Sequence, residues 1–317
     1  MQNPILAIVI PCFNEQDLIK STINSLLCKI KELSNSNIIS DESFLYFIDD
    51  GSHDETWNIL QKSNQENSKV KALKLSRNFG NQNALLAGLL GVQALNPDCV
   101  ITMDADLQQD ENSIKEFIEK YKNGADIVCG IRKDNETYSI FKNCTSVLFY
   151  KLMNLMGAKI AENHSDYRLI NKKVLNVLAE YKEVNLFLRG IFNELGFKTE
   201  HVYFDVKPRA IGQSKFGILK LLSLALSGIT SFSIVPLRIV SVIGLLMSFF
   251  SFLMGVEVIY EKVFGTGVIP GWATIVVAVC FIGGVQIFCT GIIGEYLGQV
   301  YKETKARPRY VKDIELL

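Results

Sequence analysis

The feature that most restricts the fold is a run from 239 to 256 that contains no charged residue and is rich in Leu, Ile, Val, Phe and Met. As a helix rising about 1.5 Å per residue it would be about 27 Å long, close to the roughly 30 Å hydrocarbon core of a bilayer. A second uncharged run covers 263–294 and is interrupted by Pro270-Gly271. Neither run has the polar face of a surface helix. We therefore expect two membrane spans, with two buried core helices as the alternative.

Basic residues flank these two runs on their outer sides, whereas only Lys262 lies between them. Because basic segments stay on the cytoplasmic side of a membrane, both flanks and the large N-terminal part should face the cytoplasm. The sequence thus predicts a multi-pass protein of the cytoplasmic (inner) membrane. The flanking residues are Lys207, Arg209, Lys215, Lys220 and Arg238 before the first run, and Lys302, Lys305, Arg307, Arg309 and Lys312 after the second.

The segment KFGILKLLSLALSGITSF (215–232) precedes the first span. Its polar residues Lys220, Ser223, Ser227 and Thr230 recur at spacings of three and four, which makes one narrow polar stripe on a helix. A helix of this kind fits the membrane interface, where it would lie in the plane of the bilayer. A third core helix is the alternative.

The N-terminal part has a different pattern, in which short apolar runs alternate with amphipathic segments. Alternating strands and helices predict right-handed crossovers and a mostly parallel sheet, hence an α/β fold that binds ligands beyond the carboxyl ends of its strands. We expect strands over 6–10, 44–48, 70–75, 100–103 and 126–129, and helices over 17–33, 54–65, 83–95 and 113–122.

These patterns divide the chain into four parts. We expect an α/β domain over 1–210, an interfacial amphipathic helix over 211–233, a transmembrane hairpin over 234–295 with spans at about 237–259 and 272–294, and a basic cytoplasmic tail over 296–317.

Composition excludes some classes of protein. Lys plus Arg and Asp plus Glu both total 33, and the chain has neither a basic reader helix nor zinc-finger spacing, so nothing indicates a nucleic-acid partner. The seven cysteines include no C-x-x-C pair, so we expect them to be reduced. The chain opens with Met-Gln-Asn-Pro and enters a strand-like run at once, which is unlike a signal peptide.

Two carboxylates, Asp104 and Asp106, follow the strand expected over 100–103. If the extended geometry continued, both would point to the same side, where like charges destabilise each other unless a cation lies between them. Mg²⁺ and Mn²⁺ are commonly bound by one or two carboxylates together with substrate phosphates. We expect Asp104 and Asp106, with Gln108 as a third oxygen ligand, to bind such a metal and a diphosphate. The alternative is a solvated loop in which Asp110 caps a helix.

Further motifs lie at the expected strand ends. VIPCFNE (9–15), FIDDGSHDET (47–56), LSRNFGNQNALLAGL (75–89) and DADLQ (104–108) occur in this order, and together they resemble the family 2 glycosyltransferases, which have a GT-A fold. In the second half, SDYRLI (165–170), PRAIGQSKF (208–216) and GEYLGQVYKETKARPRYV (294–311) resemble one subgroup, the polyisoprenyl-phosphate glycosyltransferases such as bactoprenol glucosyltransferases and dolichyl-phosphate mannose synthases. The resemblance covers nearly the whole chain.

The resemblance implies roles for individual residues. Pro11, Phe13, Glu15, Asp49 and Asp50 would contact the base and ribose of a nucleotide-sugar, and Asp104 and Asp106 its metal and diphosphate. Arg209 and Lys215, in a basic loop with Gly212 and Ser214, would lie near the diphosphate. Arg132, Lys142 and Ser146 would bind the acceptor phosphate. Asp166 stands where the family keeps its catalytic carboxylate, with Arg168 as its ion-pair partner or a phosphate ligand. The alternatives are helix caps for Glu15 and Asp54, and an exposed helix face for Lys142 and Ser146.

The implied reaction is the inverting transfer of one sugar, from UDP-glucose, to undecaprenyl phosphate. A phosphomonoester has a second pKa near about 6 and is mostly dianionic at neutral pH, so positioning should contribute more than a general base. The role of Asp166 therefore stays open between base and sugar orienter. Another lipid or protein acceptor, or a non-catalytic nucleotide-sugar-binding membrane protein, are the alternatives.

Two features bear on relatives and assembly. The Q-x-x-R-W motif of processive polysaccharide synthases is missing from NLFLRGIFNELG (185–196), and the segment QDEN (109–112) lacks the prolines that the resemblance leads one to expect. Small residues in the second span, such as Gly291 and Gly294, would permit close helix contacts and hence a homo-oligomer.

Overall fold

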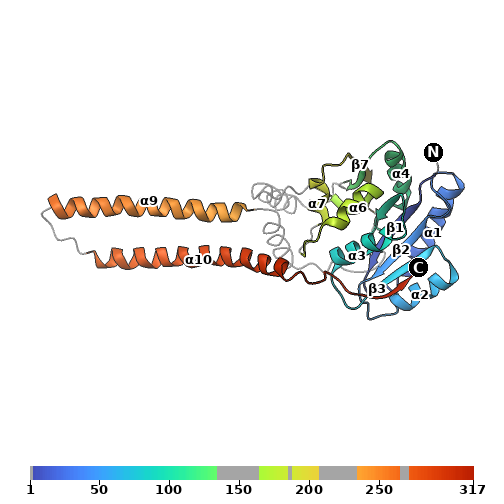
Figure 1. Cartoon of the computed structure of the whole chain (residues 1–317), viewed down its shortest axis with the longest axis horizontal. Coiled ribbons are helices and arrows are strands. Elements are labelled where there is room, and N and C mark those ends of the chain that lie inside the picture. The colour runs from blue at the N-terminus through green and yellow to red at the C-terminus, as the bar shows by residue number, and fades with distance from the viewer. Residues whose placement is uncertain (1–2, 134–163, 185–187, 207–233, 265–270) are drawn as a thin grey trace. The chain divides into compact units, whose positions relative to one another are not determined.

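The computed structural model of the chain describes residues 3–133, 164–184, 188–206, 234–264 and 271–317 (Figure 1). These residues fall into an α/β domain, to which residues 307–317 return, and a separate helical unit. The interfacial helix expected over 211–233 lies outside the described residues.

The elements of the described structure follow one another in the order β1 (Leu6–Cys12), α1 (Ile19–Asn35), β2 (Phe44–Asp49), α2 (Thr56–Glu66), β3 (Val70–Leu75), α3 (Asn81–Gln93), β4 (Cys99–Thr102), η1 (Glu111–Ser113), α4 (Ile114–Lys122), β5 (Ile127–Arg132), β6 (His164–Asn171), α6 (Lys172–Glu180), α7 (Leu188–Glu194), β7 (Thr199–Phe204), α9 (Val235–Phe264), α10 (Trp272–Thr304) and β8 (Lys312–Leu316).

One mixed sheet of eight strands forms the centre of the domain, in the order β7-β5-β6-β4-β1-β2-β3-β8. β1 pairs in parallel with β2 and β4, and β3 continues the parallel part, whereas β6 and β8 pair antiparallel with their neighbours. Strands β1, β2 and β4 are buried along their whole length. This explains why their sequences are continuous apolar runs, since helices cover both faces of the sheet (Figure 1). The predicted α/β fold is confirmed, and so are the five strands and four helices expected up to residue 129, with small shifts at their ends.

Helix α3 packs unusually close to the sheet. A Cβ atom at Gly88 would come within 2.4 Å of Cδ1 of Ile48, and one at Gly91 within 2.6 Å of the hydroxyl of Tyr46. Both positions therefore favour glycine for steric reasons, because any side chain would force the buried side chains of Ile48, Val9 or Tyr46 to shift.

The opposite face of the sheet holds the main apolar core, formed against α1, α2 and α4. Tyr167 of β6 lies at its centre, with ring centroids 4.6 Å from Phe117 of α4 and 5.3 Å from Phe204 of β7. Aromatic pairs at these distances contribute roughly 0.5–1.5 kcal/mol beyond the area they bury. The Tyr167 ring therefore fixes β6 against α4, which follows the segment 103–113 after β4, here named the acidic loop.

The C-terminal residues differ from the expected basic tail over 296–317. Helix α10 continues to Thr304, and β8 pairs antiparallel with β3 as an edge strand. The Tyr46 hydroxyl donates a hydrogen bond to Glu315, and the Ser76 amide donates one to the Val311 carbonyl at 3.0 Å. The sequence KDIEL has no continuous apolar run because β8 is mostly exposed, so its pattern did not indicate a strand.

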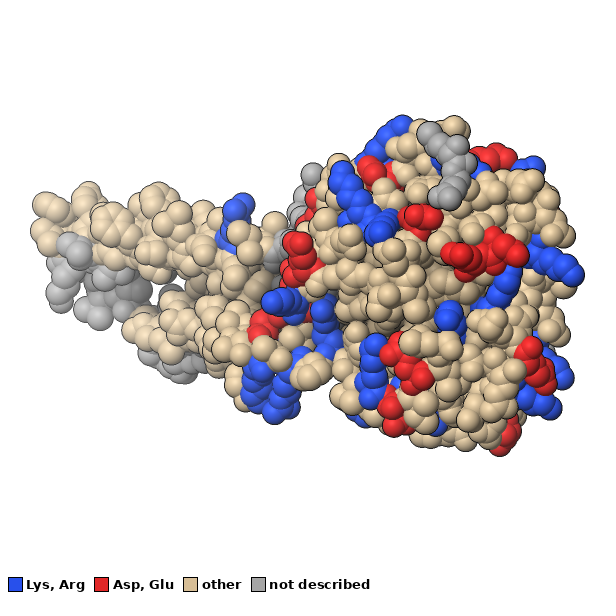
Figure 2. Space-filling model, turned by 45° about the vertical axis from the view of Figure 1, so that its right-hand side comes forward, with Lys and Arg blue, Asp and Glu red and all other residues tan. Residues whose placement is uncertain are grey.

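Helices α9 and α10 pack against each other (Figure 1). They contain the stretches Val235–Glu257 and Phe281–Thr304, which are long and apolar enough to cross a membrane and have none of their length buried in the described structure. Figure 2 shows almost no charged side chains along the middle of this helical unit, whereas acidic and basic side chains are mixed over the α/β domain. Both helices extend beyond the spans expected at about 237–259 and 272–294.

Replacing the buried tyrosine hydroxyl tests how β8 is attached. We expect Tyr46→Phe to lower the free energy of unfolding of the α/β domain by about 1–3 kcal/mol, because the hydroxyl donates to a carboxylate at a partly buried site. Chemical denaturation of the detergent-solubilised protein would measure this. Tyr203→Phe, which changes an exposed tyrosine at the other edge of the sheet, is the matched control and should have little effect. Equal stability of the two variants would contradict the proposed attachment.

Candidate active site

Three loops meet at the carboxyl edge of the parallel strands. The pairing of β1 with β2 places Cys12 opposite Asp49, and the pairing of β1 with β4 places Val9 opposite Thr102. The segments that follow these strands therefore leave the same edge of the sheet. They are the segments in which the sequence places its acidic and aromatic candidates.

The acidic loop after β4 turns sharply. The strand ends at Thr102 and Leu107 has a φ of 53°, so Asp104 and Asp106 lie in a compact turn and not on the extended strand considered from the sequence. The Gln108 backbone amide donates to Oδ1 of Asp106 at 3.2 Å. A short turn of this kind holds the two carboxylates close to the sheet edge.

Gln109 is a residue that the sequence reasoning missed. It is 1% exposed, its Nε2 donates to Oδ2 of Asp104 at 2.8 Å, and its Oε1 accepts the Asp104 backbone amide at 3.0 Å. Gln108, the predicted ligand, is only half-buried. A glutamine next to another glutamine carries no periodic signal, so only the turn geometry distinguishes the two.

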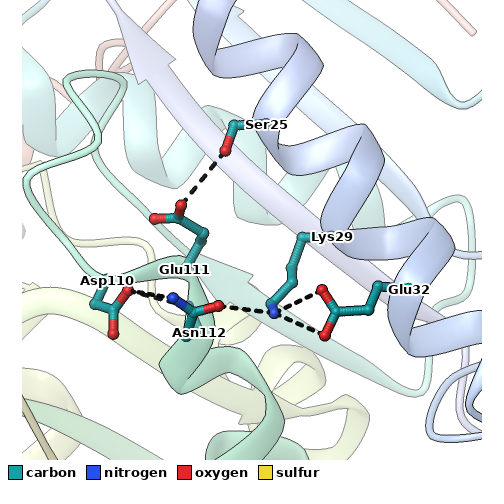
Figure 3. A network of polar contacts seen from close by, with 6 residues as sticks. All are labelled: Ser25, Lys29, Glu32, Asp110, Glu111 and Asn112. Carbon is teal, nitrogen blue, oxygen red and sulfur yellow. Dashed lines mark hydrogen bonds and ion pairs between the residues drawn. The ribbon is translucent and has the colours of Figure 1, made fainter.

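Helix α1 anchors the acidic loop. The Thr22 hydroxyl donates to the Ala105 carbonyl at 2.7 Å, in a buried position. Farther along the helix, Nζ of Lys29 binds Glu32 at 2.9 Å and donates to Oδ1 of Asn112 at 2.9 Å (Figure 3). Because the Lys29 side chain is only 9% exposed, these contacts compensate a largely desolvated charge.

Three more contacts hold the far end of this loop. The side chain of Asp110 accepts a hydrogen bond from the Asn112 backbone amide at 3.3 Å and so caps η1, as the alternative from the sequence predicted. The Tyr167 hydroxyl donates to the Asp110 backbone carbonyl at 3.1 Å. Ser25 of α1 contacts Glu111 at 3.5 Å (Figure 3). The loop is thus held from α1, from β6 and by its own side chains.

Asp49 and Asp50 are both buried at the end of β2. Oδ1 of Asp49 accepts the Ser52 amide at 3.1 Å, while Oδ2 has no hydrogen-bond partner among the described residues. The two oxygens of Asp50 accept the amides of Phe79 and Gly80, at 2.7 Å and 2.9 Å. Burial raises the pKa of both carboxyl groups above the usual value for aspartate. Asp50 therefore shapes the turn before α3, whereas Asp49 keeps a desolvated acceptor atom at the loop edge.

The loops after β1 and β2 are joined by reciprocal hydrogen bonds. The Asn14 backbone amide donates to Ser52 Oγ, and the His53 backbone amide donates to Asn14 Oδ1, both at 2.9 Å. The Glu15 backbone amide donates to Thr56 Oγ1 at 2.9 Å. Asp54 accepts the Thr56 backbone amide at 3.0 Å just before α2, but the N-cap residue of that helix is Glu55 and not Asp54, as the alternative had suggested.

This joined pair of loops presents one aromatic ring to solvent. Phe13 is 39% exposed and contacts the ring of His53 edge-on, with centroids 6.4 Å apart, whereas Pro11 before it is buried in β1. An exposed aromatic ring on a fixed loop offers a face on which a planar ring can stack.

Asp166 and Arg168 lie on one face of β6, because they are two residues apart on a strand. The Thr102 hydroxyl donates to the Asp166 carbonyl, which ties β6 to the end of β4. The Arg168 side chain is buried: Nε contacts Sγ of Cys129 at 3.4 Å and the guanidinium lies 4.3 Å from the centroid of the Phe192 ring. One of its terminal nitrogens has no partner among the described residues.

The remaining predicted residues divide into two groups. Arg132 lies at the exposed end of β5, opposite Phe204 of β7. The others, Lys142, Ser146, Arg209 and Lys215, together with Gly212 and Ser214, lie outside the described residues.

The oxygen ligands of the acidic loop fit a hard divalent cation whose coordination is completed by a ligand. Across the described parts of the chain, no group of three or more His, Cys, Asp or Glu side chains could hold a metal by itself. Mg²⁺ and Mn²⁺ accept one or two carboxylates together with waters and phosphate oxygens, so two fixed aspartates suffice.

Comparison with known proteins agrees with this fold. Residues 7–178 match the model of glycosyl transferase family 2. The chain is 43% identical over 313 residues to the uncharacterised glycosyltransferase YkoT of Bacillus subtilis, covering 99% of this chain and 92% of that one. It is 38% identical over 307 residues to the bactoprenol glucosyl transferase of Shigella phage SfX, covering 96% and 98%. The protein is therefore a glycosyltransferase with a GT-A-type α/β domain. It belongs to glycosyl transferase family 2.

A pair of aspartate variants tests the electrostatics of the site. Because burial raises the pKa of Asp49, ionisation of its carboxyl group should destabilise the folded state at pH values above that pKa. This destabilisation should fade as the pH falls toward the pKa of aspartate in the unfolded chain, about 3.9. Asp49→Asn should therefore raise the unfolding temperature at pH 8 by a few degrees, and by progressively less as the pH falls toward about 4. Thermal unfolding of the detergent-solubilised protein measures this.

Asp54→Asn is the matched control, and its effect should have the opposite sign. The pKa of Asp54 is lowered although burial acts to raise it, because hydrogen bonds from Thr56 and Gln16 outweigh burial. Its ionised form stabilises the fold above the unfolded pKa, and that contribution is lost as the pH falls. Asp54→Asn should thus lower the unfolding temperature at pH 8. A loss of stability in Asp49→Asn at pH 8 would contradict this account of Asp49.

Proposed function

We propose that the protein transfers one sugar from a nucleotide diphosphate sugar, UDP-glucose, to a polyprenyl phosphate at the cytoplasmic face of the membrane. The observation that carries the proposal is the combination of a rigidly anchored acidic loop in a family 2 domain with two apolar helices in the same chain. The acidic loop would bind a water-soluble donor. The two apolar helices would hold the domain at the membrane, where a lipid acceptor lies. The name of the phage relative, bactoprenol glucosyl transferase, supports both the sugar and the acceptor.

The donor would bind across the loops after β1, β2 and β4. Phe13 would provide a face for the base, and Pro11 and Glu15 would line the same loop. Oδ2 of Asp49, which has no hydrogen-bond partner among the described residues, would accept a hydrogen bond from the base or ribose. The turn that Asp50 holds before α3 completes this side of the site.

Asp104 and Asp106, with Gln108, would hold Mg²⁺ or Mn²⁺ against the diphosphate. The cation, when bound, neutralises charge that develops on the leaving diphosphate. The chain's contribution is to keep both carboxylates in one turn, so that little reorganisation is needed when the donor arrives. Arg209 and Lys215 would add positive charge beside the same diphosphate.

The acceptor phosphate would bind near Arg132 at the end of β5, with Lys142 and Ser146. One phosphate oxygen attacks the anomeric carbon from the side opposite the diphosphate, the bond from that carbon to the diphosphate oxygen breaks, and the nucleoside diphosphate leaves with the electron pair. The configuration at the anomeric carbon is thereby inverted. Because the attacking phosphate is mostly dianionic, no proton has to be removed.

Asp166 and Arg168 lie on the strand between β4 and β5, and hence between the acidic loop and Arg132 in the sheet order. From there Asp166 would orient a sugar hydroxyl, and Arg168 would balance the carboxylate or the incoming phosphate. The two apolar helices would anchor the domain with its basic flanks on the cytoplasmic side.

A lipid-extraction assay tests the reaction. Purified protein in detergent is given undecaprenyl phosphate, Mn²⁺ and radiolabelled UDP-glucose, and label is followed into the organic phase. We expect transfer that EDTA abolishes and that Asp106→Ala reduces by at least about a hundredfold, because a metal ligand is lost. Label from another nucleotide-sugar alone would correct the donor. No lipid label from any donor, with nucleotide binding intact, would favour another acceptor or a non-catalytic binding protein.

An asparagine variant distinguishes the acceptor classes. With a dianionic phosphate acceptor, Asp166→Asn should reduce the rate but leave measurable transfer, because Asp166 has no proton to remove. With a neutral hydroxyl acceptor, the same variant should abolish turnover. The pH dependence of the rate should be the same in Asp166→Asn and wild type, because it follows the second ionisation of the acceptor phosphate, with a pKa of about 6. Complete loss of lipid transfer in a folded Asp166→Asn protein would contradict the orienting role.

A further inference from the structure

Gln109 is fully buried at the acidic loop, and both of its polar atoms contact Asp104. One contact is to the backbone amide at 3.0 Å and the other to carboxylate Oδ2 at 2.8 Å. The two residues therefore form a closed ring of two hydrogen bonds. This arrangement ties the orientation of the Asp104 carboxylate to a side chain that the protein interior holds in place.

Only a carboxamide satisfies this geometry. The Asp104 amide needs an acceptor and the Asp104 carboxylate needs a donor, so the oxygen and nitrogen of Gln109 are assigned without ambiguity. A glutamate would lack the donor and would add a second negative charge. An apolar residue would leave a buried amide and a carboxylate without these partners, which is costly for groups that are removed from water.

The surrounding loop keeps Gln109 from moving away. Thr22 holds the carbonyl of Ala105 on one side of it, and Tyr167 holds the carbonyl of Asp110 on the other. Leu107, with its positive φ, turns the chain back between these two anchors. The position of Gln109 relative to Asp104 is thus a property of the folded loop.

We propose that Gln109 is a positioning residue that sets the affinity of the Asp104 carboxylate for a divalent cation, a role that rests on the proposed function. Each carboxylate oxygen has two lone pairs, so Oδ2 can keep its hydrogen bond from Gln109 while the carboxylate binds a cation. As a neutral donor, Gln109 orients the carboxylate without neutralising it. Partners of metal ligands that act in this way typically change metal affinity by about 10–100-fold when they are replaced.

The test is a titration of the full-length protein in detergent with Mn²⁺, in the presence of UDP, followed by the electron paramagnetic resonance signal of free Mn²⁺. Gln109→Met keeps the volume and removes both hydrogen bonds. We expect it to weaken Mn²⁺ binding about 10–100-fold, and to raise the Mn²⁺ concentration for half-maximal transfer by a similar factor. The rate at saturating Mn²⁺ should stay within about threefold of wild type, because the ligands themselves are intact.

The matched control is Gln93→Met, the same change at a half-exposed glutamine of α3 whose amide contacts Asn176. It should bind Mn²⁺ as wild type does. Gln109→Ala is the second variant, and metal-free thermal unfolding shows whether each protein is folded. If Gln109→Met is not folded, the Mn²⁺ titration of Gln109→Ala provides the test.

Three outcomes would overturn the proposal: unchanged Mn²⁺ affinity in the folded Gln109 variants, a lower rate at saturating Mn²⁺ with unchanged affinity, or equal weakening in Gln93→Met. A wild-type protein that binds UDP but no Mn²⁺ would instead overturn the metal step of the proposed function. The two failures are therefore distinguishable.

Discussion

The parallel pairing of β1 with both β2 and β4 is the constraint on which the rest of the site depends. Parallel strands deliver their following loops to one edge of the sheet, so residues far apart in the sequence, Phe13, Asp49 and Asp104, come to the same edge without any direct attraction between them. The strands can pair in this way because they are apolar on both faces and helices cover both sides. The close approach of α3, where Gly88 and Gly91 are favoured, completes that cover.

Polar contacts in buried positions then hold the loops rigid. Thr22, Lys29 and Gln109 each place a polar group where water is largely excluded, and each satisfies it on the acidic loop. These bonds also explain how the segment 109–112 is fixed without the prolines that family resemblance leads one to expect. Asp49 is the opposite case, because its second oxygen lacks a partner among the described residues. A buried acceptor of this kind lowers stability and is consistent with a ligand-binding role.

Much of the fold was readable from the sequence, and the parts that were not have identifiable causes. Strands up to residue 129 were found because each is a short apolar or alternating run, and helical segments separate one strand from the next. Strand β8 was missed because an exposed edge strand has no apolar pattern, and its partner β3 is more than two hundred residues away. Gln109 was missed because its importance comes from a turn in which Leu107 adopts a positive φ, and no periodicity encodes that turn.

The sequence by itself determined the α/β class, the two apolar helices, the resemblance to family 2 glycosyltransferases, and the acidic pair Asp104 and Asp106. These follow from local patterns of polarity and from short motifs, which need no knowledge of long-range contacts. Only the tertiary structure decided that Asp50 is engaged by the turn before α3, that α1 anchors the acidic loop, and that Gln109 holds Asp104. Each of these depends on which polar groups meet once the backbone has packed, and that is set by distances between segments the sequence keeps apart.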